Sequence, residues 1–222
     1  MSTAPSEPAI LYPDCDGEPI AENTLQFRWI VTIHGGLTAL FRDRPDVFVA
    51  GDLLWYPVEG RNKYRTAPDA MVVFGRPKGE RGSYRQWVEG NIPPQVVFEI
   101  LSPGNRPGEM RRKRLFYERN GVEEYYIYDP EKITLEGYLR QGDRLRSIRE
   151  MHGWTSPRLG VRFVMNLGGE ELQILDPQGK PFATYQEVIE EAEAERARAA
   201  EASVRAERLA AQLRALGIEP EA

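Results

Sequence analysis

The sequence has little of what several classes of protein require. Its single cysteine, Cys15, excludes an intramolecular disulfide framework, and no cysteine–histidine spacing resembles a zinc site. Residues 1–13 contain proline and acidic residues where a secretory signal needs a basic start and an apolar stretch, and no later apolar run approaches the length of a membrane span. We therefore expect a soluble protein of the reducing cytoplasm with no membrane partner.

The sequence also lacks an excess of positive charge. Its formal net charge is −5, which by itself argues against a nucleic-acid partner. Nine acidic and five basic side chains lie in residues 184–222, so residues 1–183 hold 25 acidic and 24 basic side chains and are nearly neutral. Within them, basic residues form three clusters, and either phosphate contacts or solvated surfaces explain such clusters. The clusters are Arg61, Lys63 and Arg65; Arg76, Lys78, Arg81 and Arg85; and Arg106, Arg111, Arg112, Lys113, Arg114 and Arg119.

What is present is a chain of 222 residues, 41% hydrophobic, which is enough for one core with an appendage. Residues 1–21 are rich in proline and aspartate and predict a loose N-terminal arm. Apolar residues then recur at helical spacing over residues 25–41, with Thr24 as the expected N-cap. We expect the main domain to span residues 22–183.

The middle of the chain alternates short apolar runs with proline-containing turns, the pattern of strands. One helix is expected between them, over residues 108–120, where Asn120-Gly121 stops it, and residues 75–90 form a long loop. The pattern predicts an α/β fold with a mixed sheet and few helices. The expected strands are residues 47–56, 70–74, 96–101, 125–128 and 134–139, with shorter pieces in residues 158–175.

Residues 184–222 predict one long helix. Thr184 and Glu187 form a capping-box pattern, and a run rich in glutamate, alanine and arginine continues to Leu216. Alternate steps of four and three define a coiled-coil seam that Glu195 alone interrupts. The seam predicts a homodimer or higher homo-oligomer, although a solitary charged helix also explains the pattern, because alanines contribute little on burial. Its positions are Val188, Ala192, Glu195, Ala199, Ala202, Ala206, Leu209, Leu213 and Leu216.

Two carboxylates and one lysine are the candidates for chemistry. Glu99 interrupts an apolar strand, and a buried charge of this kind needs a compensating partner. Asp69 opens the strand at residues 70–74, although an aspartate after Pro68 also suits a turn. On the helix that follows Glu99, Lys113 falls within the apolar side, where a lysine is unusual unless it snorkels or meets a carboxylate.

Together these residue types are the ingredients of metal-assisted hydrolysis. Asp69 and Glu99, with the backbone carbonyl of Ile100 as a third ligand, are candidates to hold Mg²⁺, for which Mn²⁺ is a substitute. Lys113 would then stabilise charge on the phosphorus or help to deprotonate the attacking water.

Four segments resemble the Uma-two family, a bacterial domain of unknown function that looks like a branch of the PD-(D/E)xK nuclease superfamily. The resemblance covers roughly residues 22–180 and implies a restriction-endonuclease-like fold and Mg²⁺-dependent cleavage of DNA. It places Asp69 and Glu99 at the two acidic positions and Lys113 at a lysine of the following helix. The segments are residues 67–73 (APDAMVV), 94–103 (PQVVFEILSP), 109–117 (EMRRKRLFY) and 121–130 (GVEEYYIYDP).

One position departs from the wider superfamily, because Leu101 stands two residues after Glu99, where that pattern has its lysine. The resemblance implies that Lys113 presents its amine to the same space. Glu109 stands where the family has an acidic residue, as an accessory ligand or a partner of Lys113, and His34 resembles a family histidine that is either structural or close to the site. Residues 76–87 suit either nucleic-acid binding or a packed loop.

Three functions follow as hypotheses. The first is a Mg²⁺-dependent endonuclease. The second is a catalytically inactive binding or scaffold protein that keeps the fold and oligomerises through the C-terminal helix, which Leu101 and the negative net charge favour. The third is a hydrolase of small phosphoesters, which needs no basic groove.

Overall fold

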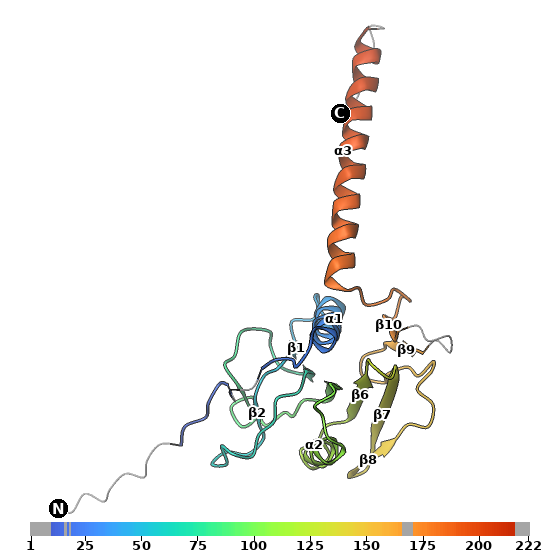
Figure 1. Ribbon diagram of the computed structural model, residues 1–222. Helices are drawn as coiled ribbons and strands as arrows, with labels where there is room; N and C mark the ends of the chain where they lie inside the picture. Colours follow the sequence, from blue (N-terminus) through green and yellow to red (C-terminus); the bar gives the residue numbers. More distant parts are fainter. Residues whose placement is uncertain (1–9, 16, 18, 166–170, 216–222) are drawn as a thin grey trace, which may run out of the picture. The chain divides into compact units, whose positions relative to one another are not determined.

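The computed structural model describes residues 10–15, 17, 19–165 and 171–215, and it divides the chain into two compact units, Met1–Phe182 and Ala183–Ala222. The first unit is built on a six-stranded mixed sheet with helices on its faces (Figure 1). The α/β class expected from the alternating pattern is confirmed.

The six-stranded sheet has the strand order β1-β3-β5-β6-β7-β8. Within this sheet β5 and β6 pair in parallel, and its other four pairs are antiparallel. Two further pairs stand outside this sheet: β2 with β4, and β9 with β10. The strands are β1 (Val47–Ala50), β2 (Trp55–Tyr56), β3 (Ala70–Phe74), β4 (Tyr84–Arg85), β5 (Val96–Ile100), β6 (Glu124–Asp129), β7 (Thr134–Gln141), β8 (Arg144–Ser147), β9 (Arg162–Val164) and β10 (Gln173–Leu175).

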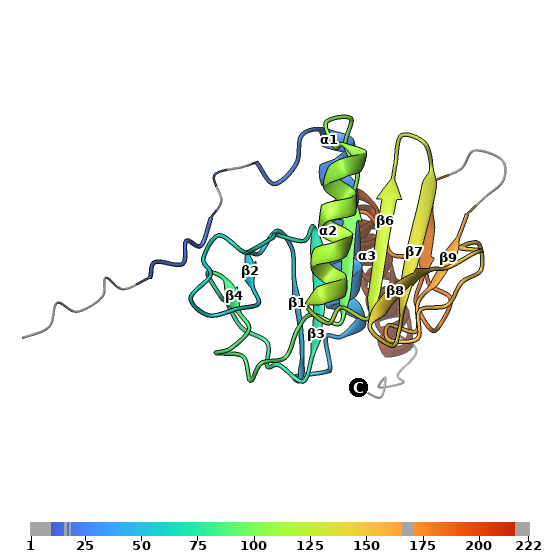
Figure 2. The same ribbon diagram turned by 90° about the horizontal axis from the view of Figure 1, so that it is seen from below.

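One helix covers each face of the sheet, α1 (Thr24–Leu40) on one side and α2 (Pro107–Arg119) on the other (Figures 1 and 2). Because successive strand residues point to opposite faces, each strand contributes to both cores. Phe98 packs with the buried side of α1, and Val97 packs with Tyr117 of α2. The central strands β5 and β6 are buried along their whole length, so a charged residue on them is enclosed by protein.

Two local expectations were wrong. The N-cap of α1 is Asn23 and not Thr24: the Asn23 side chain accepts a hydrogen bond from the Gln26 backbone at 2.8 Å, and Thr24 is the first helical residue. The expected strand at residues 47–56 is broken after Ala50, where Asp52 takes a left-handed backbone conformation with φ of 48°. The chain turns there because a left-handed residue cannot continue a strand.

The described part of the N-terminal arm is packed and not loose. Tyr12 contacts the rings of Tyr56 and Trp87, with centroid distances of 5.3 and 5.0 Å, and the Tyr56 hydroxyl donates to the Pro13 carbonyl at 2.6 Å. Aromatic contacts and a satisfied carbonyl hold this segment against β2 and β4.

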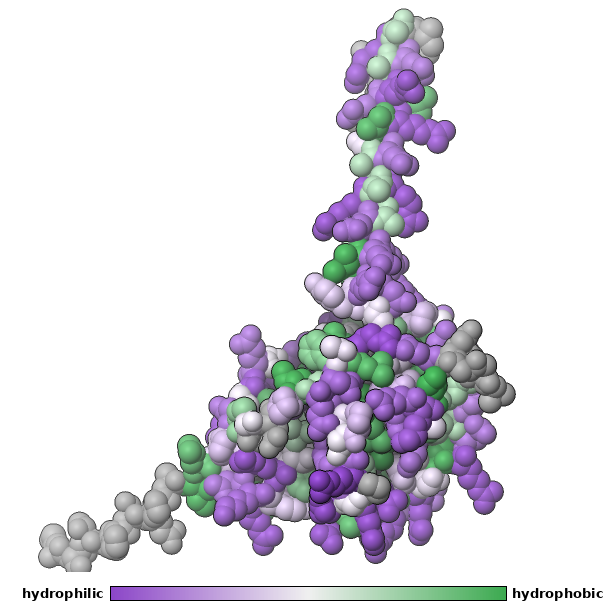
Figure 3. Space-filling view, in the orientation of Figure 1, coloured by the Kyte–Doolittle hydropathy of each residue, from purple (hydrophilic) through white to green (hydrophobic). Residues whose placement is uncertain are grey.

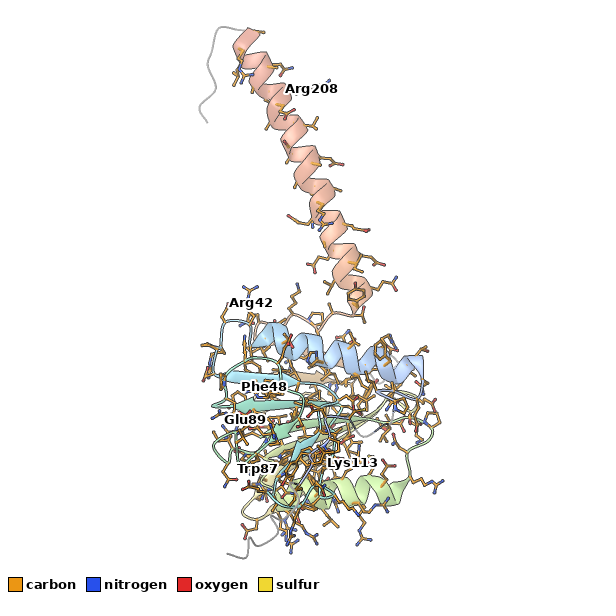
Figure 4. All side chains as sticks on the ribbon, turned by 90° about the vertical axis from the view of Figure 1, so that its left-hand side faces the viewer. Arg42, Phe48, Trp87, Glu89, Lys113 and Arg208 are labelled. Atoms are coloured by element: carbon orange, nitrogen blue, oxygen red, sulfur yellow. The ribbon has the colours of Figure 1, made fainter. Side chains whose placement is uncertain are left out.

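The region expected to be a long loop, residues 75–90, contains β4, and its cations Arg76, Lys78 and Arg81 make internal contacts. Arg76 and Arg81 both pair with Glu89, at 2.9 and 2.7 Å, and Lys78 donates to the Phe41 carbonyl at the end of α1. Arg81 also lies over the Phe48 ring, in the region of Phe48, Trp87 and Glu89 in Figure 4. Of the two explanations, these contacts favour the packed loop.

The second unit contains α3 (Tyr185–Ala215), and none of the described residues of this helix is buried. The capping box forms as predicted, with a Glu187 carboxylate oxygen 2.7 Å from the Thr184 backbone nitrogen. Small and apolar side chains lie between charged ones along the helix (Figure 3). In the described chain, no helix has the length and apolar character that a membrane crossing requires.

Candidate active site

The pairing of β3 with β5 brings Asp69 and Glu99 to neighbouring positions. Ala70 pairs with Phe98 in this antiparallel ladder, so the next pair along it is Asp69 with Glu99. Side chains two residues apart on a strand point to the same face, so Asp69 points to the face of Met71 and Glu99 to that of Val97, and both of these lie in the α2 core. The register therefore points both carboxylates toward the face that α2 covers.

Helix α2 supplies two partners to Glu99. The Lys113 ammonium lies 2.7 Å from Glu99 Oε2, and the Tyr117 hydroxyl donates to Glu99 Oε1. Lys113 and Tyr117 are four residues apart and so lie on one side of the helix. Both contact Glu99 of β5, so this side faces the sheet; Lys113 is labelled in Figure 4. The Glu99 side chain is only 2% exposed, so it is a buried carboxylate with a cation and a hydroxyl as its partners.

Asp69 is held by the backbone that follows Glu99. Its Oδ2 accepts a hydrogen bond from the Ile100 backbone nitrogen at 2.6 Å. The Ile100 carbonyl in turn accepts a hydrogen bond at 2.8 Å from the buried side chain of Gln26, in the first turn of α1. The first strand carboxylate, the end of β5 and the start of α1 are thus linked in one chain of hydrogen bonds.

Asp69, Lys113 and Gln26 line a cleft of about 520 Å³, whereas Glu99 and Ile100 are buried beside it and are not among its lining residues. Segments far apart in the sequence form its walls: the end of the arm, the start of α1, the chain between β1 and β3, and the first half of α2. Its charged lining comprises four acids, Glu22, Asp52, Asp69 and Glu109, and three bases, Lys63, Arg65 and Lys113.

Among the acids of the cleft, Asp69 has a strongly raised pKa. Burial, and after it the charge of Glu99, raises the pKa of Asp69 to about 8, while the Ile100 backbone N–H and the Lys113 charge act against this rise and Asp52 adds to it. Two carboxylates that share one lysine are short of positive charge. A cation at Asp69 would relieve this shortage.

Lys113 stays charged at neutral pH. Burial lowers the pKa of its ammonium group, but the charge of Glu99, the hydrogen bond to it and the charges of Asp69 and Glu109 outweigh that effect, and the pKa lies above its ordinary value. A protonated amine is a hydrogen-bond donor and a point charge, not a base.

The oxygen atoms of this site suit a hard divalent cation. Among the described residues, no group of three or more His, Cys, Asp or Glu side chains is arranged to hold a metal. The candidate donors are therefore two carboxylates, Asp69 and Glu99, with the Ile100 carbonyl, and of these Asp69 lines the cleft. A carboxylate has about four lone pairs and a carbonyl two, and the hydrogen bonds named above leave lone pairs on each group. Mg²⁺ is typically held by one or two carboxylates and keeps several waters, which fits this donor set.

The remaining candidates are divided between the cleft and its surroundings. Glu109 lines the cleft one helical turn before Lys113. His34 is not among the described residues that line it. Its ring and the backbone carbonyl of Asp69 both lie next to Gly51: a Cβ added to this glycine would be 3.4 Å from the ring and 3.2 Å from the carbonyl. Burial lowers the pKa of His34, which favours its neutral form. Leu101 packs against the α2 core, on the side from which Lys113 approaches Glu99.

Three residues of the site were missed in the sequence. Tyr117 carries no charge that would mark it, and its position four residues after Lys113 was the available signal. Asp52 directly follows a strand and a glycine, a position like that of many site carboxylates. Gln26 gave no signal, because a glutamine in the first turn of a helix is ordinary.

Comparison with known proteins places this chain among nuclease-like sequences. Residues 3–167 match the model of the Uma2 family, the Uma-two family named above, whose description is "Putative restriction endonuclease". No curated protein matches. Among solved structures, the chain is similar to one titled a "putative nuclease belonging to DUF820 from Anabaena variabilis ATCC 29413", with a TM-score of 0.45 and 18% identity over 61% of this chain and 72% of that chain.

Proposed function

The chain belongs to the Uma2 family, described as "Putative restriction endonuclease", and from that premise we propose that it is a Mg²⁺-dependent endonuclease that hydrolyses phosphodiester bonds of DNA. Asp69, Glu99 and Lys113 are the proposed catalytic residues. The observation that carries the proposal is the 2.7 Å contact between the Lys113 ammonium and Glu99 Oε2, next to the strand position of Asp69. Asp69 and Lys113 line the cleft, and the buried Glu99 pairs with Lys113.

Each proposed role follows from the environment of the group. Asp69, Glu99 and the Ile100 carbonyl would hold the cation, with Mn²⁺ as a substitute for Mg²⁺. The bound cation would polarise the phosphate and lower the pKa of a water molecule. Because the pKa of Lys113 is raised, we assign this residue to stabilising negative charge on the phosphate and not to removing a proton from water. Tyr117 and Gln26 are positioning residues, since they bind Glu99 and the Ile100 carbonyl.

The proposal is tested by nicking of supercoiled plasmid in Mg²⁺ and in Mn²⁺. We expect the wild type to nick, and Asp69→Asn, Glu99→Gln and Lys113→Met each to lose at least about 100-fold in rate. The first two remove carboxylates that hold the cation, and the third removes the positive charge that acts on the phosphate. The matched controls are Asp43→Asn, Glu150→Gln and Lys132→Met, which make the same changes at exposed positions outside the cleft.

The inactive-scaffold alternative makes the opposite prediction. Both oxygens of Glu99 already have partners, and Leu101 occupies the usual lysine position, which are the observations in its favour. If pure protein leaves plasmid intact in both metals, or if the site variants nick as fast as the controls, the nuclease proposal fails. Hydrolysis of a small phosphodiester without nicking of plasmid would favour the third hypothesis.

We further propose that the protein forms a homodimer through α3. Leu216 of the predicted seam lies outside the described residues. The other seam positions lie on α3, none of whose described residues is buried, so they are open to a second copy. Glu195, the charged seam residue, pairs with Arg198 of its own helix at 2.7 Å, which lowers the cost of placing it in an interface.

A further inference from the structure

A groove lined mainly by arginines lies between the second half of α2 and the β7–β8 hairpin. It consists of two hollows, of about 700 and 390 Å³, which share Leu115, Glu118 and Arg144. Five arginines and two acids, Glu118 and Asp143, line it. The arginines are Arg114, Arg119, Arg140, Arg144 and Arg146.

The walls of this arginine groove are fixed by hydrogen bonds. One Glu118 oxygen accepts from the Leu145 backbone at 2.8 Å, and the other pairs with Arg144 at 2.9 Å. Arg140 donates to the carbonyls of Glu118 and Val122, at 2.6 and 2.7 Å. The helix and the hairpin are therefore joined in a defined geometry. This lowers the conformational-entropy cost of ordering the groove when a ligand binds.

The charge of the groove is only partly compensated. Glu118 has both oxygens engaged, so one acid remains, the exposed Asp143. Arg119 and Arg146 are exposed, and Arg111 and Arg112 extend the positive surface along the outer side of α2. Because the chain has a net charge of −5, this local positive surface is a preferred binding surface for an anionic partner.

Helix α2 separates the arginine groove from the cleft. Lys113 lines the cleft, whereas its neighbour Arg114 lines the groove and lies over the Tyr138 ring at 5.1 Å. A helix is about 10–12 Å across, and duplex DNA carries one charge per about 1.7 Å of its axis, so a duplex that crosses α2 spans several phosphates between the two sides.

We propose that the arginine groove and the outer side of α2 bind the phosphate backbone of a nucleic-acid duplex and hold it across the helix, with one strand at the cleft. This inference rests on the proposed nuclease function and deepens it. The planar guanidinium group binds phosphate oxygens in pairs, which fits a wall of arginines better than a point contact with a small anion. The binding is independent of base sequence, because every contact is to phosphate.

The test is fluorescence anisotropy with a labelled 30-base-pair duplex in EDTA, where no metal supports cleavage, over a series of NaCl concentrations. The variant is Arg112→Ala/Arg119→Ala/Arg146→Ala, and the matched control is Arg205→Ala/Arg208→Ala/Arg214→Ala on α3, which removes the same charge from exposed positions. We expect Kd to rise by at least about tenfold in the variant, and the slope of log K against log salt to fall by about 2–3, since each lost phosphate contact removes about 0.9.

The inference is overturned if the groove variant and the control bind with equal Kd and equal salt slope, or if the wild type does not bind the duplex at 50 mM NaCl. Tighter binding of polyglutamate than of duplex would show that the groove serves an acidic protein. If the triple variant is misfolded by circular dichroism, Arg119→Gln/Arg146→Gln replaces it. Duplex binding that depends on the groove, with no nicking in any metal, would support the surface and contradict the nuclease.

Discussion

The Lys113 ammonium lies 2.7 Å from Oε2 of Glu99, and it joins a helix to a strand that is buried along its whole length. The Lys113 side chain is 24% exposed, whereas that of Glu99 is 2% exposed. The lysine therefore connects a buried acid to the cleft.

Loss of Lys113 should reduce stability as well as activity. Lys113→Met leaves Glu99 buried with Tyr117 as its remaining partner, and removing one member of such a pair costs about 3–5 kcal/mol when both are fully buried. Because Lys113 is partly exposed, we expect about 2–4 kcal/mol, measured by urea unfolding. The control Lys132→Met removes an exposed lysine that pairs with Asp129 at 2.8 Å, and it should lose no more than about 1 kcal/mol. Equal stability of the two variants would contradict a buried pair.

Two tyrosines of the α2 core should respond in opposite ways to the same change. Tyr117→Phe removes the hydroxyl that binds Glu99, so we expect a loss of about 1.5–3 kcal/mol and slower nicking. The Tyr125 hydroxyl is buried without a hydrogen-bond partner among the described residues, so Tyr125→Phe should be neutral or stabilise by up to about 1 kcal/mol. The two rings pack 4.9 Å apart, which makes the pair a matched test by thermal unfolding. A larger loss from Tyr125→Phe would refute the assignment.

Stability without metal should fall as the pH rises. Because burial and the charge of Glu99 raise the pKa of Asp69 to about 8, the folded protein keeps a proton that the unfolded chain releases near pH 4. The unfolded state thus binds fewer protons between about pH 4 and 8, and the free energy of unfolding decreases with pH across this window.

Urea unfolding in EDTA at pH 5, 6.5 and 8 measures this slope, and Asp69→Asn should flatten it. The same proton should be released when Mg²⁺ or Mn²⁺ binds, so metal affinity should rise up to about pH 8 in titration calorimetry. A slope that Asp69→Asn leaves unchanged would assign the effect to another group.

Removal of α3 should convert the protein from dimer to monomer. We expect light scattering to give twice the chain mass for the full chain and the monomer mass for a chain that ends at Phe182. Glu195→Leu should strengthen the dimer, because it replaces the charged seam residue with an apolar one. Monomers for both the full and the shortened chain at micromolar concentration would remove the dimer proposal.

What the sequence determined by itself is local. Glu99 was identified as the single carboxylate in an apolar run, and Lys113 as a lysine on the apolar side of a helix. The capping box identified the start of α3. Each of these signals depends only on neighbours within one or two turns. The same locality explains the wrong N-cap, since Asn23 and Thr24 are adjacent and both residue types cap helices.

Only the tertiary structure decided which distant groups meet. The register of β3 against β5 sets Asp69 beside Glu99, and a slip of one residue would turn the carboxylates to opposite faces. The docking of α2 gives Glu99 its second partner, Tyr117, and the pairing of Glu118 with the β8 backbone brings Arg146 to the arginines of α2. Such contacts depend on how whole elements pack, and no pattern within a single element specifies that packing.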